Sequence, residues 1–162
     1  MSIALYRIDD RLMHGQVVVG WGRPLRVSLI VLVDDVVASS SWEQDLYRMG
    51  TPPEMELVFE TCAGAIERLP WYQADPRSAI LLTADVETMR KIVEATGSVR
   101  QVNIGGLHHR TGRSPRLHYV FLSPEEERSL RDIEARGVSV TAQDLPSASP
   151  VRLAEVLAGS GM

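Results

Sequence analysis

The sequence predicts an α/β protein with an open, mostly parallel, twisted sheet of about seven strands and helices on both faces. Two observations lead to this class. Short runs of β-branched and other apolar residues alternate with segments of helical spacing along almost the whole chain, which is typical of strand–helix–strand units. Several runs, most clearly residues 27–33, are continuously apolar, as expected of strands that are buried on both faces.

Each expected strand is a short apolar run bounded by turn residues. Consecutive parallel strands should be joined by right-handed crossovers, so the helices between them are needed to carry the chain back across the sheet. The expected strands, in chain order, are Ile3–Arg7, Val27–Val33, Met55–Phe59, Ser78–Thr83, Arg100–Gly105, Leu117–Leu122 and Val138–Ala142.

The expected helices carry start and stop signals. Residues 123–126, Ser-Pro-Glu-Glu, combine a capping serine, a proline in the first turn and acids near the positive end of a helix. Gly50 and Pro70 mark two C-terminal ends. A parallel crossover between the first two strands also requires a short helix, which we place from about Gly15. The other helices are Ser40–Met49, Cys62–Leu69, Val86–Ala95, Ser123 to Arg136 and Val151–Ala158.

Length and composition predict a single domain over residues 1–162. A chain of this length buries about 70% of its unfolded surface, so it needs no disulfide or metal to fold. The formal charge of −4 argues against nucleic acid as the main partner. Cys62 is the only cysteine, which excludes an internal disulfide and favours a reducing cytoplasm. Without a leader pattern or a long apolar run, we expect a chain that does not span a membrane by itself.

The first strand is followed by the segment 9–16, Asp-Asp-Arg-Leu-Met-His-Gly-Gln, which concentrates the reactive side chains. In an open α/β sheet, ligands collect outside the carboxyl ends of the strands, where loops meet helix amino termini. Such a terminus favours an anion by about 0.3–1 kcal/mol. The segment therefore places His14 where a phosphate is welcome, and Gly15 has no side chain to obstruct it.

An imidazole nitrogen is a good temporary phosphoryl acceptor, because the ring is neutral and nucleophilic near pH 7, with an unperturbed pKa of about 6.5. Arg11 lies three residues before His14 and can neutralise the transferring oxygens through a charge-assisted hydrogen bond, worth about 1.5–3 kcal/mol. We expect one of Asp9 and Asp10 to hold Arg11 or the His14 ring, and the other to brace the loop. The same residues also fit an ordinary loop with a salt-bridged Asp–Arg pair and an incidental histidine.

The segment 7–17, Arg-Ile-Asp-Asp-Arg-Leu-Met-His-Gly-Gln-Val, resembles the active-site signature of the mannose/fructose/sorbose-type IIB proteins of the bacterial phosphotransferase system (PTS). Further matches follow in order: Val-Asp-Asp-Val-Val-Ala at 33–38, the proline pair at 52–53, and Asn-Ile-Gly-Gly at 103–106. The resemblance covers nearly the whole chain.

This resemblance implies a phosphoryl carrier. His14 would take a phosphoryl group from a phosphohistidine on a IIA partner, through its Nδ1 atom, and pass it to a sugar held by the membrane components IIC and IID. Arg11 would stabilise the group, and Asp10 would help to shape the loop. No metal, nucleotide or other cofactor is implied. The protein would lie in the cytoplasm, peripheral to the inner membrane through its partners, and relatives suggest that a homodimer is possible.

Other residues are expected on the same rim. Gln16 completes the phosphate loop, and Asp34 follows the second strand at the same sheet edge. Gly105 and Gly106 are too few for a dinucleotide fingerprint, and their expected use is to let the backbone approach the active loop. His108 is expected at the rim as a partner-facing or phosphate-loop residue. Arg113 and Arg116 are interpreted as charges of a solvated loop.

Two other functions fit the same residues. A regulatory protein could use the same phosphohistidine without transporting sugar, because sugar handling lies in other chains. A metal-dependent hydrolase would use His108 and His109 with Asp34 and Asp35 as ligands. Adjacent histidines rarely converge on one ion, and no His-x-x-x-His or cysteine pair accompanies them, so we expect no metal.

Overall fold

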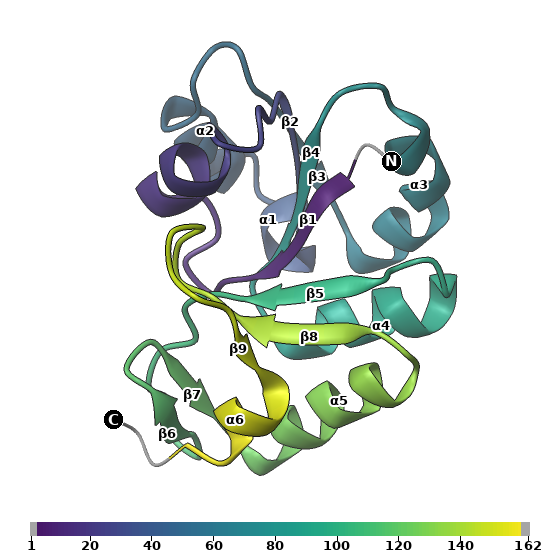
Figure 1. Ribbon diagram of the computed structural model, residues 1–162. Coiled ribbons are helices and arrows are strands. Elements are labelled where there is room, and N and C mark those ends of the chain that lie inside the picture. The colour runs from purple at the N-terminus through teal and green to yellow at the C-terminus, as the bar shows by residue number, and fades with distance from the viewer. Residues whose placement is uncertain (1–2, 160–162) are drawn as a thin grey trace.

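The computed structural model describes residues 3–159, and its main sheet has seven strands in the order β3-β2-β4-β1-β5-β8-β9 (Figure 1). Neighbouring strands are parallel except β9, which runs antiparallel to β8. This confirms the predicted class. The strands are β1 (Ile3–Ile8), β2 (Leu29–Val33), β3 (Glu56–Glu60), β4 (Ala79–Thr83), β5 (Gln101–Ile104), β8 (Ser139–Ala142) and β9 (Val151–Arg152).

Helices cover both faces of this sheet and divide the core into two clusters. The larger cluster joins one face to α3, α4, α5 and α6, and the smaller joins the other face to η1 and α1. No helix among residues 3–159 is long and apolar enough to cross a membrane. The helices are η1 (Gln16–Trp21, a π-helix), α1 (Asp35–Ala38), α2 (Ser41–Met49), α3 (Cys62–Ala74), α4 (Val86–Thr96), α5 (Pro124–Ala135) and α6 (Leu153–Leu157).

The strand order creates a crevice between β1 and β5. The two strands are neighbours, yet the chain leaves β1 toward β2 on one side and leaves β5 toward β8 on the other. Loops that depart in opposite directions leave a gap at the carboxyl ends of the two strands, which is where ligands bind in open α/β sheets. The loop after β1 carries the segment 9–16, so the fold brings it to this crevice.

The expected strand Leu117–Leu122 is wrong. The chain instead forms a separate antiparallel hairpin of β6 (Ser114–Leu117) and β7 (Val120–Leu122), with a turn at residues 118–119. A strand can fold back on itself through so short a connection only in antiparallel pairing. The seventh strand of the main sheet is β9, which occupies the first two residues of the expected helix Val151–Ala158.

Helix α3 continues through Pro70 to Ala74, although the sequence predicted its end at Leu69. A proline inside a helix removes one hydrogen bond and costs about 3 kcal/mol. The residues around it offset this cost, because Leu69 is fully buried and Tyr72 packs against the larger core. Tertiary burial thus overrides the local stop signal.

Truncation of Leu81 to alanine should destabilise the fold by about 2–5 kcal/mol. Leu81 is fully buried in β4, between β2 and β1, where a cavity cannot collapse easily. The free energy of unfolding in urea measures the loss. Leu46→Ala is the matched control, because Leu46 is 49% exposed on α2 and should change stability by only about 0.5 kcal/mol. Equal losses in both variants would contradict the assignment of β4 to the core.

Candidate functional site

The loop after β1 and the segment after β5 are held together by backbone hydrogen bonds at the crevice. Gly105 N donates to Ile8 O at 2.7 Å, and Asp10 N donates to Gly106 O at 2.8 Å. Leu12 turns the loop with a φ of 56°, which is strained for a leucine, and its buried side chain in the smaller core holds it there. The loop is therefore fixed at its start and at its bend.

Asp9 is the common acceptor of this site. Its side chain is fully buried, and it accepts hydrogen bonds from the backbone N, Nε and Nη2 of Arg11, each at 3.2 Å. Arg7 Nη2 donates to it at 3.3 Å and Gly106 N at 3.2 Å. Burial would raise the pKa of Asp9, but its contacts with His14 and Arg11 outweigh burial and hold the pKa well below its ordinary value. The carboxylate is ionised at neutral pH.

Arg7 lies beneath Asp9 and is a site residue that the sequence reasoning missed. Its side chain is fully buried, and it donates to Asn103 Oδ1, to Gln143 O at 2.9 Å and to Asp144 O at 3.2 Å. Its guanidinium also lies 5.0 Å from the ring centroid of Trp21. Burial lowers the pKa of Arg7, and the charge of Asp9 opposes that shift. An arginine inside an otherwise apolar central strand was the available signal.

Arg11 reaches from Asp9 toward solvent. Its Nη2 also donates to Gln16 Oε1 at 2.6 Å, and its side chain is 36% exposed. Within residues 3–159, no hydrogen bond of Arg11 uses Nη1. One face of the guanidinium is thus fixed by Asp9 and Gln16, while a donor remains free for an incoming oxygen.

His14 turns one ring nitrogen inward and the other outward. Nε2 is buried and lies 3.2 Å from Asp9 Oδ2, an ion-pair distance at which the N–H is not well enough aligned for a hydrogen bond. The side chain is 16% exposed. Within residues 3–159, Nδ1 makes no hydrogen bond and is not buried, so it reaches solvent. The ring therefore does not point into the apolar interior.

Asp10 braces the opposite wall of the crevice. It accepts from the backbone N of His108 at 2.7 Å and lies 2.6 Å from His108 Nδ1. Arg113 donates to His108 O at 2.7 Å and pairs with both carboxylate oxygens of Glu126. The Arg113 side chain is only 5% exposed, so its interpretation as a solvated charge was wrong. The two acids divide their tasks as expected, with Asp9 on Arg11 and Asp10 on the loop.

Two glycines allow the close approach of β5 to the site. A Cβ on Gly105 would lie 2.6 Å from Asp9 Oδ2 and would overlap the Arg7 guanidinium. A Cβ on Gly106 would meet the His108 ring at 3.2 Å and Arg11 Nε at 3.3 Å. His108 and Arg11 therefore both border the same point above Gly106.

Asp34 caps the helix after β2, and Gly15 precedes the helix after β1. The Asp34 carboxylate caps α1 by accepting from Val36 N at 3.3 Å. Burial, with the nearby charge of Asp85, raises the pKa of Asp34. Gly15 precedes η1, a helix of six residues whose dipole is small, so Arg11 is the main positive charge at the loop. No three His, Cys, Asp or Glu side chains within residues 3–159 gather as a metal site.

The fold and the site together define a class of protein. It is a doubly wound α/β protein whose switch-point crevice holds a histidine and a partly exposed guanidinium on one buried carboxylate, an arrangement suited to an anionic group. Residues 3–161 match the family described as "PTS system sorbose subfamily IIB component". The chain belongs to this family, whose members are phosphotransferase components of sugar uptake.

Three relatives illustrate the match. The N-acetylgalactosamine-specific phosphotransferase enzyme IIB component 1 of Escherichia coli (strain K12) is 36% identical over 149 residues, 90% of this chain and 92% of the relative. The solved IIBSor domain of the sorbose permease from Klebsiella pneumoniae has a TM-score of 0.88 and 26% identity, covering 98% of this chain and 97% of that one. The mannose-specific EIIAB component of E. coli (strain K12) is 26% identical over 97% of this chain, which spans 49% of the relative.

Replacement of Gly105 by alanine should both destabilise the protein and impair phosphotransfer, because the new Cβ would collide with Asp9 and Arg7. We expect a loss of about 1–3 kcal/mol in unfolding free energy, the usual cost of overpacking. Gly50→Ala is the control. Its Cβ would have no neighbour closer than 3.8 Å and its φ of −90° suits any residue. Wild-type stability of the Gly105 variant, measured by urea unfolding, would show that the close approach is unnecessary.

Proposed function

We propose that His14 is the residue of this IIB component that carries the phosphoryl group, taking it from a phosphohistidine of IIA and delivering it to a sugar held by IIC and IID. One observation carries this proposal: His14 turns Nε2 toward a buried carboxylate oxygen that also binds Arg11, and leaves Nδ1 open to solvent. The proposal treats residues 1–162 as one IIB domain that works in the cytoplasm next to its membrane partners.

The Asp9 contact selects the reactive nitrogen. A carboxylate beside Nε2 favours the tautomer with the proton on Nε2, which leaves the lone pair on Nδ1. Nδ1 then attacks phosphorus, a new N–P bond forms, and the N–P bond of the donor phosphohistidine breaks with its electron pair returning to the donor ring. The positive charge that develops on the His14 ring lies next to Asp9. On delivery to the sugar, a sugar hydroxyl oxygen attacks phosphorus and an O–P bond forms. The N–P bond breaks with its electron pair returning to Nδ1, and the hydroxyl proton is released to solvent.

Arg11 stabilises the group in transit. Phosphoryl transfer passes through a loose transition state in which charge spreads over three oxygens, so positioning and charge are the main catalytic devices. The guanidinium is held on one side by Asp9 and Gln16 and keeps a free donor on the other. Gly106 and Gly15 leave room around the group, and Asp34 lies further along the same sheet edge.

His108 forms the opposite rim of the proposed phosphate site. Its ring is fixed by Asp10, stays 56% exposed, and borders the same point above Gly106 as Arg11 does. A histidine held in this way can donate a second hydrogen bond to a phosphoryl oxygen when it is protonated. We assign His108 this supporting role.

A partner surface lies on α2, whose apolar side chains face solvent. Trp42 is 70% exposed, Leu46 49% and Met49 83%, and their spacing puts them on one side of the helix. Exposed clusters of this kind mark protein contacts, and tryptophan is enriched at their centres. We assign this face of α2 to one of the partner components.

Phosphorylation should map to His14. Incubation with phosphorylated IIA is expected to give one acid-labile, base-stable phosphoramidate, located at His14 by mass spectrometry at neutral or basic pH. His14→Ala should accept none, because no other histidine has the same contact with Asp9. His118→Ala is the control and should be phosphorylated as the wild type is, since His118 lies in the β6–β7 turn, against Tyr119. An unmodified His14 in the wild type would end the proposal.

Replacement of Arg11 by lysine should slow transfer by at least about tenfold although the charge is kept. The planar fork that spans Asp9 and leaves Nη1 free is lost, and a hydrogen bond to a charged group is worth about 1.5–3 kcal/mol. Single-turnover transfer from IIA, followed by quenched-flow, measures the rate. Arg128→Lys is the matched control, because Arg128 is 70% exposed on α5. Equal rates for both variants would remove Arg11 from the mechanism.

A further inference from the structure

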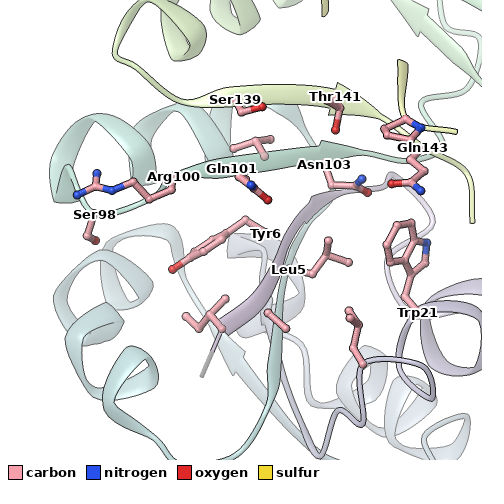
Figure 2. Close-up of a pocket in the computed structure, with 15 residues that line it drawn as sticks. Leu5, Tyr6, Trp21, Ser98, Arg100, Gln101, Asn103, Ser139, Thr141 and Gln143 are labelled. Carbon is pink, nitrogen blue, oxygen red and sulfur yellow. The ribbon is translucent and has the colours of Figure 1, made fainter. Parts of the chain in front are cut away.

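The two halves of the main sheet differ in burial. Every residue of β2 and β4 is buried, since helices cover both faces there. In β5 and β8, apolar residues of the larger core alternate with polar residues that face the other way. On that second face, a cavity of about 500 Å³ lies over β1, β5 and β8 (Figure 2), and none of its described lining residues belongs to the loop 9–16 that carries His14.

The floor of this cavity is a polar ladder. Gln101 pairs with Ser139 across the strands, and Asn103 pairs with Thr141. Within residues 3–159, the side chains of Gln101, Ser139 and Thr141 make no hydrogen bond, and Asn103 uses only its Oδ1, which accepts from Arg7. Figure 2 shows these side chains on one side of β5 and β8. Four neighbouring polar groups therefore keep free donors and acceptors.

The opposite wall is apolar and aromatic. Leu5, Leu25 and Trp21 are among its lining residues. Figure 2 shows Tyr6 at the end away from Trp21. Trp21 is fixed in place, because its Nε1 donates to Asp144 O at 3.0 Å. The cavity thus offers hydrogen-bonding groups on one side and a firm apolar surface on the other, within the size range of small-molecule sites.

We propose that this cavity binds a monosaccharide, at a site separate from His14. A sugar ring presents adjacent hydroxyls, each a donor and an acceptor, on its edge, and a C–H surface on its face. The hydroxyls match the ladder of amides and hydroxyls, and the C–H surface matches Leu5 and Leu25, which are only partly buried. Binding at this site needs no phosphoryl group.

Other ligand classes fit less well. Among residues 3–159, the lining contains no carboxylate, so these residues lack the ligands of a metal cation. Arg100 is the one charged residue in the described part of the lining. It is exposed and donates to Gly97 O, so the cavity is not built for an anion. An apolar helix laid on this face would strip water from four polar side chains without replacing their hydrogen bonds, which is unfavourable.

The test is a titration of the full, unphosphorylated chain with N-acetylgalactosamine, mannose, fructose or sorbose, followed by ¹H–¹⁵N NMR. At least one sugar should give saturable shifts at residues 101–103 and 139–141. The double variant Ser139→Ala/Thr141→Val should bind that sugar at least about tenfold more weakly, because it removes two hydrogen-bonding hydroxyls and keeps the shape. Thr88→Val/Ser129→Ala, on α4 and α5, is the matched control and should bind as the wild type does.

Three results would overturn the proposal. The first is the absence of saturable shifts with all four sugars. The second is shifts confined to the loop 9–16, which would place the sugar at the phosphoryl site instead. The third is a wild-type dimer, seen by sedimentation, that the double variant abolishes, which would make this face a contact between copies. None of these measurements depends on His14, so failure here leaves the phosphotransfer proposal untouched.

Discussion

The buried carboxylate of Asp9 is the interaction on which the site depends. Removing an ionised carboxylate from water costs several kcal/mol, which only good partners offset. Here Arg7 lies below, Arg11 lies to one side, and the backbone N–H of Gly106 completes the shell. The charges of Arg7 and Asp9 cancel each other. The positive charge of Arg11 is therefore available to an anion that binds at the crevice. The same carboxylate faces His14, and one group thereby sets the position of the cation and the ring.

This constraint explains features that are otherwise unrelated. Asp9 can be reached by the amide of Gly106 only if β5 approaches β1 closely, and Gly105 makes room for that approach. The loop must also bend back on itself within three residues, which places Leu12 in a left-handed conformation. A residue in such a conformation persists only where its surroundings enforce it, and the burial of Leu12 does so. The geometry of His14 therefore rests on packing as much as on polar contacts.

The sequence predicted the fold class, most strands and the position of the loop 9–16 at the sheet edge, because these follow from local patterns: apolar runs, helix caps and a dense cluster of charged residues after the first strand. It did not predict Arg7 or Arg113 as structural members of the site. Arg7 finds its partners on β5 and after β8, and Arg113 finds Glu126 on α5. These contacts span long sequence separations that no local pattern encodes. The same limit explains the hairpin β6–β7 and the strand β9, since pairing partners decide whether a short apolar run joins the main sheet.

Arg7 also shows why the two sides of the sheet cannot be considered separately. Its guanidinium binds Asp9 at the crevice, Asn103 on the open face, and the carbonyls of Gln143 and Asp144 beyond β8. Asn103 and Gln143 in turn line the cavity over β5 and β8. An apolar residue at position 7 would leave both carbonyls and the Asp9 carboxylate short of donors in a buried place, which is costly. A single cation thus joins the carboxyl ends of three strands, and the open face and the histidine loop share one support.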